Sequence, residues 1–461
     1  MHSKNIIYII IYMIWLIKND GMKGRLGKLV LPIFIETALV MLLGVVDTVM
    51  LSQYSDNSVA AVGVVNQIVN LAVLVFQVIS FGTTVLCSQY LGAGLKERMV
   101  QATGVAIVLN AVSGAIISAC LYFGCTAILK LMGLRPELLT EGVSYMHIVG
   151  AFAFFQAISL AISASLRSAD KAKYPMMVTV VVNVLNIIGN YTLIFGKFGM
   201  PALGVEGAAI STSIARGVSM VLLFVILFRK HIPSFPVRLF RPFPWIELKN
   251  LLKIGLPAAG EEISYSGSQV VITFFINMLG NEALITRTYC WNMAFIVCVF
   301  SIAMGQGGAI LIGHLVGEKK VKTAFILGCY TRRVAIVTAA TFSVVLAMCG
   351  GTILSWLTDN PNIVCLGIII MWVQVALEIG RAINIWATQA LRATGDVNFQ
   401  FYVGITVQWL VSVVLSYLLG IHWGLGLIAM WASFALDENI RGLIFIFRWK
   451  SMKWATKSFV N

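Results

Sequence analysis

A few carboxylate side chains lie within long apolar stretches of a 461-residue chain in which only 11% of the residues are charged. An ionised carboxylate at the centre of a bilayer costs roughly 2.5–3.5 kcal/mol on insertion scales, so it needs a proton, a cation or an ion-pair partner. Each of these acids is therefore a candidate for ion binding, proton transfer or a buried ion pair. They are Glu36, Asp47, Glu261, Glu262, Glu378, Asp437 and Glu438.

Glu36 and Asp47 lie 11 residues apart in the first apolar stretch. On an α-helix this spacing places both side chains on one face, about 16 Å apart along the axis. A polar stripe on an otherwise apolar helix favours a water-filled cavity over contact with lipid. We expect Asp47 to have a functional role rather than a structural one, whereas Glu36 has either a functional role or a structural one near the helix start.

Three asparagines follow each other at helical spacing in the fifth apolar stretch, at Asn183, Asn186 and Asn190. Residues three and four apart share one helix face. Amides on such a face can coordinate an ion, hydrogen-bond a protonated carboxyl, or join neighbouring helices. The sequence leaves these three roles open.

The second half of the chain contains two further sets of charged residues that are predicted to interact with each other within each set. Glu378 and Arg381 are three residues apart and can pair on one helix face. The pair is either satisfied internally or also contacts a substrate. Asp437, Glu438 and Arg441 are expected to form a self-neutralising structural cluster.

The elements that carry these residues are predicted to be membrane-spanning helices. Hydrophobic residues make up 59% of the chain and the mean hydropathy is +0.90, whereas a soluble domain is about a quarter charged. An outer-membrane barrel would instead show alternating segments of about ten residues. The sequence predicts an all-α polytopic membrane protein with about twelve spans. They lie near 29–51, 59–90, 101–130, 143–166, 175–195, 205–228, 251–278, 283–315, 324–350, 363–391, 399–420 and 424–447.

The net charge of +14 is explained by topology. Basic residues concentrate in every second predicted loop, which by the positive-inside rule places both termini in the cytoplasm. A nucleic-acid partner is therefore not needed to account for the charge. The eight cysteines form no CxxC pair and are interpreted as small apolar residues.

The two halves of the chain repeat with an offset of 225 residues. Pro32, Glu36, Arg167 and Arg216 correspond in this way to Pro257, Glu261, Arg392 and Arg441. Each half holds about six spans, so the halves form a parallel repeat about an axis along the membrane normal. The predicted organisation is an N-terminal extension (1–24), a six-helix lobe (25–228), a basic, proline-rich cytoplasmic linker (229–250), a second six-helix lobe (251–450) and a C-terminal tail (451–461).

The N-terminal extension contains an apolar stretch at 6–17 that is short for a membrane span. Lys4 precedes it, but no small-residue cleavage site follows, which argues against a signal peptide. The segment is either interfacial or an extension placed before the true start at Met22, and we favour the second interpretation.

Two six-helix lobes joined by a long linker are typical of a rocking transporter with its substrate path between the lobes. No phosphate-binding GxxxxGK[ST] loop is present, so we expect an ion gradient rather than ATP to drive transport. No catalytic or metal motif such as HExxH occurs, and we expect neither an enzyme nor a cofactor.

Adjacent helical residues point about 100° apart, so only one of Glu261 and Glu262 can face a cavity squarely. We expect Glu262 to face the cavity between the lobes and attract a cation, and Glu261 to have a role shared with Glu36. Aromatic residues nearby either stack on flat cations or serve as packing and interface residues. The expected substrate-cavity residues are Glu261, Glu262, Glu378, Arg381, Tyr265 and Trp291.

Several strings resemble the multidrug and toxic compound extrusion (MATE) family over nearly the whole chain from about residue 25. They are LVLPIFIETALVMLLGVVDTVMLSQ, VAAVGVVNQI, the paired LRSAD and LRATGD, and NIIGNYTLIFG followed by GVEGAAISTS. The resemblance implies two six-helix bundles around a V-shaped cleft, and antiport of organic cations against Na⁺ or H⁺.

The resemblance also assigns residues to an ion or proton site in the first lobe. The aspartate of the family's VDT string is Asp47 here, and Asn186 and Thr212 match further family positions. Asn190 stands where some members have Asp, so a Na⁺ site built from two acids is in doubt; Asp47 would be the metal ligand if Na⁺ is the coupling ion. The expected coupling residues are Asp47, Asn186, Asn190, Thr212 and Glu36.

The second lobe departs from the family pattern. Its acids follow the proline closely, and Arg381 stands at the position of the tenth-helix aspartate, as in a Gram-positive-type branch. The expected function is export of small organic cations by a monomer in the inner membrane of a prokaryote. A lipid-linked saccharide flippase of the same superfamily is the alternative, and a non-transporting membrane scaffold is a third possibility.

Overall fold

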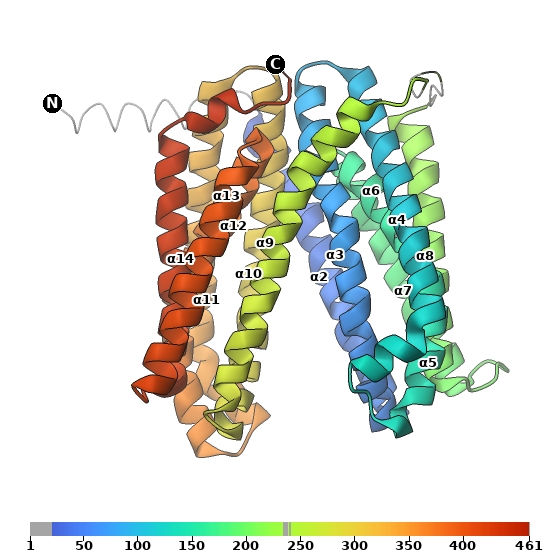
Figure 1. Cartoon of the computed structure of the whole chain (residues 1–461), viewed down its shortest axis with the longest axis vertical. Helices are drawn as coiled ribbons and strands as arrows, with labels where there is room; N and C mark the ends of the chain where they lie inside the picture. Colours follow the sequence, from blue (N-terminus) through green and yellow to red (C-terminus); the bar gives the residue numbers. More distant parts are fainter. Residues whose placement is uncertain (1–20, 234–237, 239–240, 461) are drawn as a thin grey trace. The chain divides into compact units, whose positions relative to one another are not determined.

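The computed structural model describes residues 21–233, 238 and 241–460. These residues are almost entirely helical, and no β-strand occurs among them (Figure 1). By internal contacts the chain divides into two compact units, which are described separately. Unit 2 comprises Leu31–Leu256, and unit 1 comprises the described residues up to Val30 together with those from Pro257 onward.

Unit 2 is a bundle of long helices whose apolar sides meet in one interior. Side chains from α3, α4, α5, α6 and α8 form its core, where Phe76, Leu129 and Met146 are fully buried. The helices are α2 (Met22–Ser52), α3 (Asp56–Gly92), α4 (Lys96–Leu131), α5 (Pro136–Ala151), α6 (Ala153–Ser168), α7 (Lys173–Phe195) and α8 (Gly204–Ile226), which η1 (Leu227–His231) extends.

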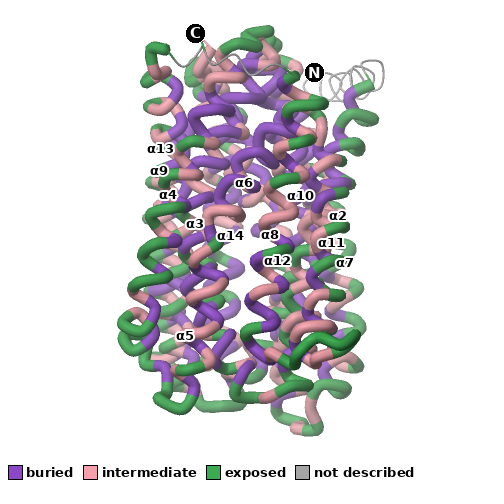
Figure 2. Tube along the Cα trace, turned by 90° about the vertical axis from the view of Figure 1, so that its right-hand side faces the viewer, coloured by how far each residue is buried: buried purple, intermediate pink, exposed green. Residues whose placement is uncertain are grey.

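Unit 1 has the same kind of interior, in which Ile276, Leu377 and Trp431 are fully buried. In both units, buried and exposed stretches alternate along individual helices, as expected when one side of each helix faces a bundle interior (Figure 2). The helices are α9 (Trp245–Asn277), α10 (Asn281–Gly317), α11 (Val321–Leu357), α12 (Pro361–Thr394), α13 (Val397–Val407), η3 (Gln408–Val413), η4 (Ser416–His422), α14 (Gly426–Lys450) and η5 (Lys453–Thr456).

Helices α2 and α9 each belong to both units. The contact boundary falls after Val30 in α2 and before Pro257 in α9, next to the repeat-related prolines inside these helices. These boundaries lie close to, but not at, the predicted lobe starts at residues 25 and 251. The first turns of α2 pack in unit 1, with Val30 against Gly307, and those of α9 pack in unit 2.

The predicted fold class is confirmed, with one predicted span divided into two helices. Among the described residues, nine helices are long and apolar enough to cross a membrane, and the α5–α6 pair makes a tenth. That pair covers the predicted span 143–166 and is bent by 43° around Phe152. Helices α9 and α14, which carry the adjacent acid pairs, correspond to the remaining two predicted spans but are not among these ten.

The turns between helices have local causes. The side chains of Ser55 and Asn360 accept hydrogen bonds from backbone N–H groups at the starts of α3 and α12. Gly196 and Gly395 end α7 and α12 in the left-handed conformation that favours glycine. The prediction about residues 1–20 lies outside the described residues, as do 234–237 and 239–240 of the predicted linker.

Candidate functional site

Asp47 begins a chain of polar side chains inside unit 2. Asn190 Nδ2 donates to Asp47 Oδ1 at 2.7 Å and to Asn186 Oδ1 at 3.1 Å. Asn186 Nδ2 in turn donates to Thr212 Oγ1 at 3.3 Å. The structure therefore brings together four of the five predicted coupling residues, from α2, α7 and α8.

Two further groups complete the surroundings of Asp47. Arg216 on α8 lies close enough to interact electrostatically with Asp47 and with Tyr145 on α5. Tyr145 is buried and contacts Thr212. The site thus contains one carboxylate, one guanidinium and several neutral hydrogen-bonding groups.

This arrangement suits the gain and loss of a proton at a half-buried carboxylate. The carboxylate and the guanidinium balance each other when both are charged, and amides can serve as donors or acceptors as the carboxyl changes state. Asn190 Oδ1 is buried and has no hydrogen-bond partner among the described residues. An acceptor of this kind is available to a protonated carboxyl or to a bound cation.

The fifth predicted coupling residue lies apart from this chain. Glu36 Oε1 accepts from Arg167 Nη1 at 2.9 Å, which ties α2 to α6. Its repeat counterpart, Glu261, is buried, and its Oε2 accepts from Arg392 Nη2 at 2.7 Å and from Gln400. The two ion pairs match through the repeat, so both glutamates have a structural partner and Glu261 offers no free charge to a cavity.

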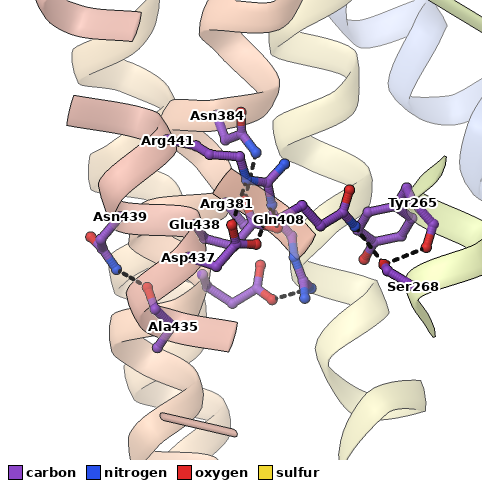
Figure 3. A network of polar contacts seen from close by, with 11 residues as sticks. Tyr265, Ser268, Arg381, Asn384, Gln408, Ala435, Asp437, Glu438, Asn439 and Arg441 are labelled. Atoms are coloured by element: carbon purple, nitrogen blue, oxygen red, sulfur yellow. Dashed lines mark hydrogen bonds and ion pairs between the residues drawn. The ribbon is translucent and has the colours of Figure 1, made fainter. Parts of the chain in front are cut away.

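Unit 1 holds a buried polar cluster formed by α12 and α14 (Figure 3). Arg381 Nη1 lies 2.6 Å from Glu378 Oε1, and this predicted pair is confirmed. Arg441 lies 2.7 Å from Asp437 Oδ2 and 3.1 Å from Glu438 Oε1, as predicted for the last span. Each ion pair also extends to neutral side chains: Gln374 donates to Glu378 and Asn384 donates to Glu438.

The remaining predicted cavity residues have different surroundings. The Arg381 guanidinium lies 5.1 Å from the ring centroid of Trp291, so this indole stacks on a protein cation. Tyr265 on α9 lies close enough to Arg381 to interact electrostatically. Glu262 is half-buried, and no hydrogen bond or ion pair to it is found in the part of the chain that the structure describes.

Sequence reasoning missed several members of both sites. The 225-residue repeat singled out Arg216 and Arg441 as corresponding residues, but it did not predict that Arg216 lies close to Asp47. Tyr145, Gln374 and Gln400 gave no signal, because single polar residues on apolar helices are common and their partners lie far away in sequence. Asn183 belongs to neither site: it donates to the backbone oxygen of Leu39 and joins α7 to α2.

The MatE family model matches residues 32–192 and again 257–418, so its two matches begin at the repeat-related prolines. The chain belongs to the MatE family of multidrug and toxic compound extrusion transporters and is a multi-pass membrane protein. A relative from Bacillus subtilis strain 168, the uncharacterized transporter YisQ, is 39% identical over 432 residues and covers 94% of this chain and 95% of its own. The multidrug resistance protein NorM of Vibrio cholerae is 25% identical, with 91% of this chain and 93% of its own covered.

Solved structures show the same fold. An outward-facing multidrug resistance MATE transporter of the MOP superfamily superposes with a TM-score of 0.85 at 19% identity, covering 94% of this chain and 96% of its own. A MOP-superfamily transporter from Pyrococcus furiosus, described as having a binding pocket of reversed polarity, gives the same score, identity and coverage. At this identity the likeness establishes the fold and not the substrate.

Proposed function

We propose that the protein is a secondary antiporter that exports small organic cations in exchange for H⁺ by alternating access of its two lobes. The observation that carries this proposal is the chain from Asp47 through Asn190 and Asn186 to Thr212. It provides one half-buried carboxylate that accepts a hydrogen bond from the neutral amide of Asn190, and this amide continues to Asn186 and the Thr212 hydroxyl, with the Arg216 guanidinium also close to Asp47. A carboxylate at membrane depth in such surroundings is suited to binding and releasing a proton.

The donor set favours H⁺ over Na⁺ as the coupling ion. Na⁺ is a hard cation that is best held by several oxygen ligands, whereas this site offers a single carboxylate because residue 190 is an asparagine. The guanidinium of Arg216, which interacts electrostatically with Asp47, repels a second cation. A proton needs only one oxygen and a hydrogen-bond acceptor.

The proposed cationic substrate follows from the charge inside the helices. Glu262 is half-buried without a partner among the described residues, and it supplies negative charge that attracts a cation. Arg381, the basic residue among the predicted cavity residues, forms an ion pair with Glu378. This pairing favours the antiporter over a lipid-linked saccharide flippase, because such flippases usually have a strongly basic cavity.

The proposed setting is the inner membrane of a prokaryote, with both termini in the cytoplasm and a single chain as the functional unit. The alternation of basic loops supports this orientation. A substrate that is apolar and charged would reach the protein from the cytoplasm or the inner leaflet.

Ethidium efflux from proteoliposomes tests the proposal, with a pH gradient or a Na⁺ gradient imposed separately. We expect efflux to follow the pH gradient and to be lost in Asp47→Asn, while the exposed control Asp359→Asn transports normally. Efflux driven by Na⁺ alone would contradict the choice of ion. Unchanged efflux in Asp47→Asn would remove this residue from the mechanism, and no efflux under either gradient from folded protein would support the flippase alternative.

A further inference from the structure

Unit 1 contains a second group of buried charges, which we call the α12–α14 cluster: Glu378, Arg381, Asp437, Glu438 and Arg441. Each of these residues is at most 8% exposed. The cluster thus contains three carboxylates and two guanidiniums. Figure 3 labels Arg381, Asp437, Glu438 and Arg441. With all five groups ionised, the cluster would carry one uncompensated negative charge.

The distances between the carboxylates and the guanidiniums place the surplus negative charge on Asp437 and Glu438. Glu378 has a guanidinium of its own, since Arg381 Nη1 lies 2.6 Å away. Asp437 and Glu438 share the guanidinium of Arg441, and its Nη2 atom lies 2.7 Å from Asp437 and 3.1 Å from Glu438. Arg441 Nε adds a second hydrogen bond to Asp437 at 3.0 Å, so Glu438 is the less well compensated of the two.

Among the described groups that interact electrostatically with the cluster, none adds a further positive charge. Glu261 interacts electrostatically with Arg441 but is paired with Arg392. Tyr265 and Cys298 lie close enough to Arg381 to interact with it electrostatically. Arg287 on α10 donates hydrogen bonds to Thr273 and Gln269 and interacts electrostatically with Tyr265.

Other elements in contact with α14 are α11, α13, η3, η4 and η5. Helix α11 carries Lys322, Arg332 and Arg333, and the Arg332 guanidinium lies over the ring of Trp386. The charged or titratable side chains of the remaining elements are the exposed His422, Lys453, Tyr402 and Tyr417.

Two polar atoms, one in the cluster and one on the neighbouring Asn384, have no hydrogen-bond partner among the described residues. They are Glu378 Oε2 and Asn384 Oδ1, and both residues are more than nine-tenths buried. Asn384 Nδ2 donates to Glu438 Oε2 at 2.7 Å. Rotation of this amide about its Cβ–Cγ bond would replace the donor by the unpartnered oxygen, which could then accept a hydrogen bond from a protonated Glu438.

A proton suits the cluster better than a metal ion. No group of three or more metal-ligating acidic, histidine or cysteine side chains with suitable geometry is found in the described part of the chain. The two guanidiniums would also repel a metal cation at this site. A proton cancels the surplus charge without needing additional ligands.

We propose that Asp437 and Glu438 share one proton, and that unit 1 thereby holds a second proton site distinct from Asp47. Because two interacting carboxyls titrate as a pair, the proton belongs to both residues. The antiporter takes up this proton from the outer side and releases it to the cytoplasm in each cycle. Two protons, one through each unit, therefore enter for every substrate cation that leaves. The buried proton is independent of the proposed function, whereas its movement in the cycle rests on that function.

Infrared spectroscopy of the purified protein tests the buried proton without any transport. The C=O stretch of a protonated carboxyl should persist at neutral pH in Asp47→Asn. This band should lose one component in Glu438→Gln and also in Asp437→Asn. Either substitution removes one carboxylate, so the cluster would be electrically neutral without a bound proton. The exposed carboxylate variant Glu318→Gln should leave the spectrum unchanged. A band unaffected by both cluster variants would overturn the proposal.

The coupling ratio tests the movement of the proton. In proteoliposomes with the membrane potential clamped at zero, each coupled proton multiplies the steady-state ethidium ratio by about ten per unit of pH gradient. We expect Glu438→Gln to lower this ratio about tenfold at a gradient of one unit, with the exposed-residue control unaffected. A wild-type ratio retained in both Glu438→Gln and Asp437→Asn would overturn the movement of this proton. If the wild-type protein transports no ethidium but the infrared band changes as expected in the cluster variants, the result would instead contradict the proposed function.

Discussion

At the scale of single residues, Asp47 depends on the amide that holds it. Asn190 donates one hydrogen bond to the carboxylate and another to Asn186, so a single side chain connects Asp47 to the rest of the polar chain. Hydrogen bonds to a charged group contribute about 1.5–3 kcal/mol. We therefore propose that Asn190 influences the balance between the protonated and ionised forms of Asp47.

Replacing Asn190 by Leu tests this dependence, because the side chain keeps a similar size but loses its donor. We expect the proton-driven ethidium flux to fall by at least about tenfold, which corresponds to the loss of one charge-assisted hydrogen bond. The matched change Asn183→Leu removes a hydrogen bond to the backbone of Leu39 and should have a smaller effect on flux. Equal losses of flux in the two variants would indicate that Asn190 acts only as helix packing.

At the scale of helices, the internal repeat places one ion pair in each unit. Glu36 and Arg167 join α2 to α6, and Glu261 and Arg392 join α9 to α12. The second pair is more deeply buried on its arginine side, where the Arg392 side chain is 3% exposed against 18% for Arg167. Breaking a buried pair by removing one partner costs about 3–5 kcal/mol, because the remaining charge is uncompensated.

We therefore expect Arg392→Met to destabilise the protein more than Arg167→Met, although the two substitutions are chemically identical. Thermal unfolding in detergent, followed by circular dichroism, measures the difference. A larger loss of stability in Arg167→Met would mean that burial does not determine the contribution of these pairs.

Close helix packing makes a separate prediction at this scale. A Cβ atom added to Gly82 would lie 2.7 Å from the backbone oxygen of Leu251, so α3 and α9 can approach this closely only because residue 82 is glycine. We expect Gly82→Ala to cost about 1–3 kcal/mol of stability. Gly63→Ala is the matched control, since nothing lies within 4 Å of its added Cβ. If both variants unfold at the same temperature, the close approach of α3 and α9 is not needed for stability.

At the scale of the whole molecule, hydropathy and the repeat predicted the helical fold, because spans and matching prolines are local features of the sequence. The pairing of Glu378 with Arg381 was also predictable, since both residues lie on one turn of one helix. The contacts of Asp47 with Asn190, and of Glu261 with Arg392, join helices far apart in sequence, and spacing carries no information about them. The surplus negative charge of the α12–α14 cluster could not be predicted from the sequence, because it depends on the contact between residues of α12 and α14 that lie far apart in the chain.

The orientation of the chain gives a prediction at this scale. In a variant without native cysteines, a single cysteine at Lys320 should react only with a reagent that reaches the cytoplasm, because this turn belongs to the basic loops. A cysteine at Phe198, whose side chain is exposed between α7 and α8, should react with an impermeant reagent added outside intact cells. The reverse pattern of labelling would contradict cytoplasmic termini.

The central claim is that Asp47 exchanges a proton for a substrate cation. Proton uptake into proteoliposomes during ethidium efflux, followed with a pH-sensitive dye, measures this exchange directly. We predict that wild type takes up protons in proportion to the ethidium released, and that Asp47→Asn loses both the pH-driven ethidium efflux and the proton uptake that accompanies it. Ethidium efflux without proton uptake in wild type, or undiminished proton uptake in Asp47→Asn, would contradict the claim.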